Sequence, residues 1–105
     1  MSEEQVTISA RIQRSLAEEV ERLATKRSVD RSTILRELLA NALKELKLKE
    51  AIELVRKREA TVWRAAEMAG VTYREMLEQL KTSNIPFPLS EEELRREIEE
   101  IFNRQ

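Results

Sequence analysis

The sequence predicts a mainly α-helical protein that begins with one β-strand. Apolar and polar residues alternate strictly only from Val6 to Ile12, whereas elsewhere apolar residues recur at the three- and four-residue spacing of helices. The composition, with 37% charged residues, one Gly and two Pro, is also that of a helix-rich protein. Because a chain of 105 residues buries only a small core, we expect it to associate with a second copy.

The predicted strand has an apolar side and a polar side, because successive side chains of a strand point to opposite faces. The apolar side carries Val6, Ile8, Ala10 and Ile12. The polar side carries Thr7, Ser9 and Arg11. Since no other stretch alternates, we expect the same strand of a second copy to be the partner. The resulting antiparallel ribbon is narrow enough to enter the major groove of DNA.

Two amphipathic helices are expected after the strand. The first begins at the capping-box sequence Ser15–Glu18 and ends near Arg27, and Asp30 caps the second. The apolar residues of the second helix are Ile34, Leu35, Leu38, Leu39, Ala42, Leu43 and Leu46. They cover more than half of its circumference, so we expect a dimer to bury them. The pattern leaves open whether residues 31–58 form one helix or two.

Residues 1–46 resemble the ribbon-helix-helix transcriptional repressors, the class of Arc and the methionine repressor. The matching features are the alternating residues 7–12, the helix from Leu16 to Lys26 and the run from Asp30 to Arg36. The resemblance implies a homodimeric domain that binds double-stranded DNA.

In that family the polar side of the strand reads base edges in the major groove. The residues at those positions here are Thr7, Ser9 and Arg11, with Arg11 expected to contact guanine. The resemblance also implies that backbone N–H groups around Arg31 and Ser32 bind a DNA phosphate. The chain departs from the family at Ser28, where glycine is frequent. It departs again at Asp30, whose carboxylate is unfavourable beside a phosphate unless it turns into the cap.

A basic patch and a predicted helix-turn-helix follow. Arg56, Lys57 and Arg58 either contact DNA phosphates beside the main site or form a solvated helix end. Thr61 is expected to cap a helix that ends at Gly70, and the capping box Thr72–Glu75 opens the next helix, to about Thr82.

The second of these helices could contact DNA through Thr72, Tyr73 and Arg74. The nearby Glu67, Glu75 and Glu78 would repel phosphate, which favours a protein-binding module instead.

Residues Leu48 to about Leu89 resemble a small family of prokaryotic proteins regarded as antitoxin-like. The resemblance rests on residues 50–54, on residues 65–75, and on Leu80 and Asn84–Pro86. It implies a partner toxin, often a ribonuclease of the PIN-domain type. The chain departs from this family before Thr61, where residues 58–60 replace the usual glycine.

The C-terminal residues predict a linker and a final helix. Two prolines make residues 84–89 extended, and Ser90–Glu93 form a third capping box. The apolar stripe of the helix consists of Leu94, Ile98, Ile101 and Phe102. Residues 90–105 contain six Glu and three Arg, a net charge of −3. The helix either docks on the preceding module or binds a toxin through its Glu residues.

The composition also excludes several functions. The chain has no Cys, no His and no catalytic motif, so we expect no enzyme activity, no metal site and no cofactor. It has no apolar run of about 20 residues and no signal peptide, so we expect a cytoplasmic protein that does not enter the membrane.

The interpretation that follows assigns two domains, residues 1–46 for dimerisation and DNA binding and residues 47–105 for partner binding. The expected function is that of a homodimeric transcriptional repressor, the antitoxin of a toxin-antitoxin pair that autoregulates its operon. The alternative is a dimeric protein-interaction scaffold without specific DNA binding.

Overall fold

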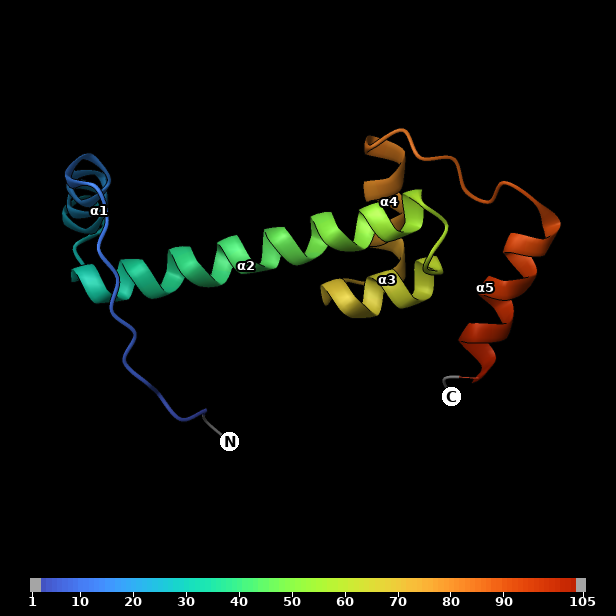
Figure 1. The fold of residues 1–105 in the computed structure, drawn as a ribbon, viewed down its shortest axis with the longest axis horizontal. Helices are drawn as coiled ribbons and strands as arrows, with labels where there is room; N and C mark the ends of the chain where they lie inside the picture. The colour runs from blue at the N-terminus through green and yellow to red at the C-terminus, as the bar shows by residue number, and fades with distance from the viewer. Residues whose placement is uncertain (1–2, 104–105) are drawn as a thin grey trace. The chain divides into compact units, whose positions relative to one another are not determined.

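The computed structural model describes residues 3–103 and is mainly helical, as predicted (Figure 1). The helices in this range are α1 (Arg14–Arg27), α2 (Arg31–Arg56), α3 (Val62–Ala69), α4 (Tyr73–Thr82) and α5 (Glu91–Asn103). None of them is both long enough and apolar enough to cross a bilayer. The chain forms two compact units whose boundary lies inside α2, between Ala40 and Asn41. The domain boundary expected at residue 46 lies a few residues later in the same helix.

The predicted N-terminal strand is not formed within the single chain. Residues 3–13 belong to neither a helix nor a strand, and all of them are exposed. A strand needs a neighbouring strand to complete its backbone hydrogen bonds, and residues 3–103 contain no other extended segment that pairs with it. The sequence analysis expects this segment to pair with the same segment of a second copy, and a single chain does not supply that partner.

The start of α1 also differs from the prediction. Its N-cap is Gln13, which makes no side-chain capping bond, and Ser15 lies inside the first turn. Arg14 is a good helix former, so the helix extends past the proposed cap. The end of α1 lies where the sequence placed it, with Lys26 and Arg27 in the last turn.

The turn from α1 to α2 is built from Ser28 and Asp30. Ser28 adopts the left-handed conformation (φ 56°), and its backbone N–H is bound to the carbonyls of Ala24 and Thr25. Asp30 Oδ1 accepts a hydrogen bond from the Thr33 backbone N–H at 2.8 Å, which confirms its role as cap. The helix that follows runs unbroken for 26 residues, which answers the question left open by the sequence.

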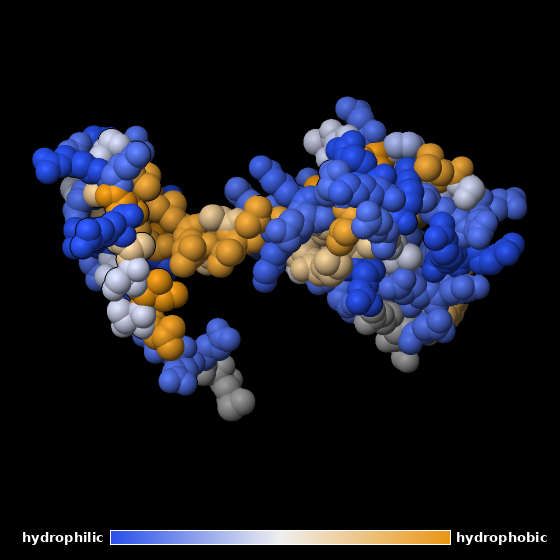
Figure 2. Space-filling view, viewed as in Figure 1, coloured by the Kyte–Doolittle hydropathy of each residue, from blue (hydrophilic) through white to orange (hydrophobic). Residues whose placement is uncertain are grey.

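The first unit has a very small core. It consists of Val20 and Ala24 of α1 and Ile34 of α2, with Leu23 packed against it. Of the seven apolar residues expected to be buried along α2, only Ile34 is buried. Figure 2 shows hydrophobic side chains uncovered along this helix, and Leu39 is 58% exposed. The single chain therefore leaves the leucines between Leu35 and Leu46 of α2 about half exposed to water.

The second unit has the larger core. The end of α2, helices α3 and α4, and the segment after α4 contribute to it. Its buried members are Ala51, Val55, Val62, Ala65, Ala66, Ala69, Met76, Leu80 and Ile85. Several of these residues are alanines, which allow helices to approach closely. In α4, Met76 and Leu80 are buried, whereas Leu77 is 36% exposed.

The predicted helix-turn-helix caps are confirmed in detail. Thr61 Oγ1 accepts from the Arg64 backbone N–H, and Gly70 takes the left-handed conformation (φ 69°) at the end of α3. Thr72 and Glu75 form the complete capping box at the start of α4. These local signals place α3 and α4 where the sequence analysis expected them.

Candidate functional site

The N-terminal arm, residues 3–13, carries the residues predicted to read DNA bases. Thr7, Ser9 and Arg11 are all exposed. The apolar side of the arm is uncovered as well, with Val6 75% and Ile8 81% exposed. Neither side of the arm is buried in a core, so all of its side chains are accessible to another molecule.

The N-terminus of α2 carries the predicted phosphate site. Ser32 is exposed in the first turn, and Arg31 forms an exposed ion pair with Glu21 at 3.2 Å. The carboxylate of Asp30 is turned into the cap, as a nearby phosphate would require. Hydrogen bonds from Thr33, with a smaller contribution from the charge of Arg36, hold the pKa of Asp30 below its ordinary value. A phosphate approaching this end would meet both the cationic Arg31 and the anionic cap.

The basic patch at the end of α2 is largely used within the chain. Arg56 pairs with Glu53 at 3.2 Å. Arg58 pairs with Glu93 at 3.3 Å and donates a hydrogen bond to the Pro86 carbonyl at 2.8 Å. Lys57 is exposed. The arginines thus have intramolecular partners, and a DNA contact through Arg58 would have to break its two interactions.

The start of α4 is engaged in the same way. The Thr72 hydroxyl is used in the capping box, and the ring of Tyr73 lies 6.0 Å from the ring of Trp63. Burial raises the pKa of Tyr73 above its ordinary value of 10.0, and the charge and hydrogen bonding of Glu97 raise it further. Arg74 is exposed. Of the three residues proposed as secondary contacts here, Arg74 is the charged one, and its side chain is exposed.

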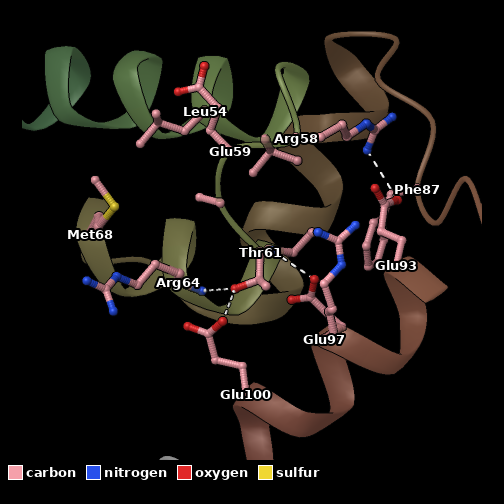
Figure 3. Close-up of a pocket in the computed structure, with 14 residues that line it drawn as sticks. Leu54, Arg58, Glu59, Thr61, Arg64, Met68, Phe87, Glu93, Glu97 and Glu100 are labelled. Atoms are coloured by element: carbon pink, nitrogen blue, oxygen red, sulfur yellow. Dashed lines mark hydrogen bonds and ion pairs between the residues drawn. The ribbon is translucent and has the colours of Figure 1, made fainter.

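Helix α5 docks on α3, as one of the two predicted alternatives expects, but it does so through its carboxylates, which the sequence analysis did not foresee. Glu97 is 2% exposed, and its two carboxylate oxygens accept the backbone N–H groups of Val62 and Trp63. Thr61 Oγ1 donates to Glu100 at 2.8 Å. Figure 3 shows these carboxylates directed toward the N-terminal end of α3. The spacing of Glu93, Glu97 and Glu100, which places them on one helix face beside the apolar stripe, is the sequence feature that indicates this docking.

The contacts of α5 border a cavity of about 380 Å³ (Figure 3). Side chains of both charges line it, among them Arg64, Arg96, Glu93 and Glu97. Among residues 3–103, no three His, Cys, Asp or Glu side chains are grouped so as to hold a metal ion. Apolar side chains such as Leu54, Met68 and Phe87 line it as well, so the cavity has a mixed polar and apolar lining.

The comparisons with known proteins agree with this architecture. Residues 6–46 match the family described as ribbon-helix-helix protein, copG family, which defines the class of the N-terminal region. Residues 29–103, more than half of the chain, match an uncharacterised protein family, UPF0175. The chain belongs to this second family. Both resemblances drawn from the sequence are confirmed. No curated protein and no solved structure matches the chain.

Proposed function

We propose that the protein is a homodimeric, sequence-specific DNA-binding transcriptional repressor. The observation that carries the proposal is the exposed arm, in which an uncovered apolar side alternates with the polar residues Thr7, Ser9 and Arg11. Apolar side chains such as Ile8 are unfavourable in water. Pairing of two arms into an antiparallel ribbon would join their apolar sides into one face that can be buried. The match to ribbon-helix-helix proteins over the same residues supports this arrangement.

The uncovered apolar residues of α2 support the homodimer independently of the arm. Leu35 is 44% exposed and Leu38 is 41% exposed, although leucine gains about 2 kcal/mol on full burial. A second copy would cover such residues, since identical surfaces meet across a two-fold axis. The dimer would then have a larger core than the small core of the first unit in a single chain.

The proposed DNA surface consists of the arm and the start of α2. Thr7, Ser9 and Arg11 read base edges, and the first turn at Arg31 and Ser32 contacts a phosphate. Lys57 and Arg74 are exposed and could add phosphate contacts, whereas Arg58 and Tyr73 already have partners in the second unit.

The second part of the proposal assigns an antitoxin role. Membership of the family that matches residues 29–103, together with the N-terminal DNA-binding match, supports a protein that represses its own operon and neutralises a co-expressed toxin. The toxin class proposed is a ribonuclease of the PIN-domain type. The chain itself is proposed to have no enzymatic activity and to act in the cytoplasm.

A dimeric interaction scaffold without specific DNA binding is the second candidate function. It is favoured by the net charge of −1, because a DNA-binding protein of this size gains affinity from positive charge. The scaffold and the repressor share the dimer but differ in the role of Arg11.

Binding to the DNA upstream of the protein's own gene distinguishes the two candidates. We expect Arg11→Ala to weaken binding by about 1–3 kcal/mol and to relax the sequence preference. Arg95→Ala, which removes an exposed arginine of α5, is the matched control and should leave affinity unchanged. The scaffold candidate predicts that neither the wild type nor the variants prefer this DNA over an unrelated fragment.

A further inference from the structure

The apolar face of α5 is uncovered in the second unit. We define this face as Leu94, Ile98, Ile101 and Phe102. Ile98 is 46% exposed and Phe102 is 70% exposed. Leu89, in the segment that precedes the helix, is 60% exposed. An amphipathic helix ordinarily buries this side against its own domain.

The reason is that α5 is held by its carboxylate side. Glu93 pairs with Arg58, Glu97 caps the N-terminus of α3, and Glu100 accepts from Thr61. These three residues occupy one helix face, and the apolar face lies beside it. These contacts hold the helix in place without covering its apolar face. The apolar face therefore remains accessible.

We propose that the apolar face of α5 is the docking surface for a partner protein that offers an apolar groove bordered by basic side chains. The evidence for the partner's charge is the composition of the helix, because residues 91–103 contain six Glu and two Arg. Glu91, Glu92 and Glu99 are exposed and are not among the carboxylates that hold α5 on α3. They are free to meet basic residues of the partner.

The same charges disfavour a second copy of this chain as the occupant. A second copy would present the same net-negative helix, with six Glu and two Arg in residues 91–103, and like charges at an interface are repulsive. A ribonuclease carries a basic surface where it binds RNA. The inference therefore rests on the proposed antitoxin function and names the surface through which that function would operate.

The test uses the purified protein encoded by the reading frame adjacent to this gene as the probe. Binding of the full chain is measured by calorimetry for the wild type and for the double variant Ile98→Ser/Phe102→Ser. Leu77→Ser, which alters an exposed leucine of α4 outside the face, is the matched control. Circular dichroism and binding to the upstream DNA verify that each variant is folded.

We expect the double variant to bind the probe at least tenfold more weakly and Leu77→Ser to bind like the wild type. Wild-type binding should also weaken when salt is raised, because exposed charges contribute to it. Equal binding by the double variant would overturn the inference and leave the proposed antitoxin role standing. Absence of binding by the wild type would overturn the antitoxin role itself. Concentration-dependent self-association that the double variant abolishes, with unchanged probe binding, would identify a second copy as the occupant and refute the proposal.

Discussion

The carboxylate of Glu97 in α5 accepts the backbone N–H of Val62, the first residue of α3, at 3.0 Å. The two residues are separated by 35 positions in the sequence. A negative charge at this point satisfies free N–H donors and interacts favourably with the positive end of the helix dipole. The acidic C-terminal helix thus completes a helix cap that the local sequence of α3 begins with Thr61.

Replacement of Glu97 by Gln should destabilise the protein. Each carboxylate oxygen accepts one N–H, from Val62 or Trp63, and the Gln amide would present a donor where one of these donors already points. We expect a loss of about 1.5–3 kcal/mol in the free energy of unfolding, measured by urea denaturation. Glu99→Gln, on the exposed side of the same helix, is the control and should change stability by less than about 0.5 kcal/mol. Equal stability of the two variants would contradict the capping role.

The cap at Asp30 should make stability depend on acidic pH. Its folded-state pKa is lowered from the ordinary value of 3.8, chiefly by the hydrogen bond with Thr33. A lowered pKa contributes stability that is present above the unfolded value and is lost as pH falls through the folded value. Asp30→Asn retains a good cap but does not titrate.

We therefore expect the wild type to lose stability relative to Asp30→Asn as the pH falls below about 4. The measurement is chemical denaturation at a series of pH values from 6 to 2.5. Glu19→Gln, at an exposed position of α1, provides the comparison for a carboxylate without this hydrogen bond. Parallel curves for wild type and Asp30→Asn would show that the cap does not contribute.

Glycine at position 28 should stabilise the chain. Ser28 has a φ of 56°, in a region that costs a residue with a side chain about 1 kcal/mol and that glycine occupies freely. We expect Ser28→Gly to increase the unfolding free energy by up to about 1 kcal/mol, offset in part by the greater entropy of the unfolded chain. The matched change Ser15→Gly, in the first turn of α1, should instead destabilise. A loss of stability in Ser28→Gly would mean that the serine side chain contributes to the turn.

The features that could be predicted correctly are helix caps and turns, because these depend on residues that are adjacent in the sequence. The caps at Asp30, Thr61 and Thr72 and the left-handed Gly70 all follow from a few adjacent side chains and backbone groups. Ser15 was assigned wrongly because a capping motif competes with the helix propensity of the residue before it.

Glu97 could not be assigned because its partners come from α3, far away in the sequence. The predicted strand was expected to pair with a second copy, and residues 3–13 of the single chain form no strand. For the predicted DNA site, the structure adds that Thr7, Ser9 and Arg11 are exposed, while Arg58 and Tyr73 are held by contacts with other segments of the chain.

Disulfide trapping across the proposed two-fold axis tests the central claim most directly. The natural chain contains no cysteine, so a single Ser9→Cys variant introduces one thiol per chain in the middle of residues 6–12. Opposed residues of antiparallel strands have Cα atoms about 4.5–5.5 Å apart, within the range of a disulfide. The control is Ser90→Cys, at an exposed position outside the arm. We predict that mild oxidation converts Ser9→Cys largely into a covalent dimer, with lower yields for Thr7→Cys and Arg11→Cys. Cross-linking of all three arm variants no faster than Ser90→Cys would contradict the paired ribbon and the DNA-binding function built on it.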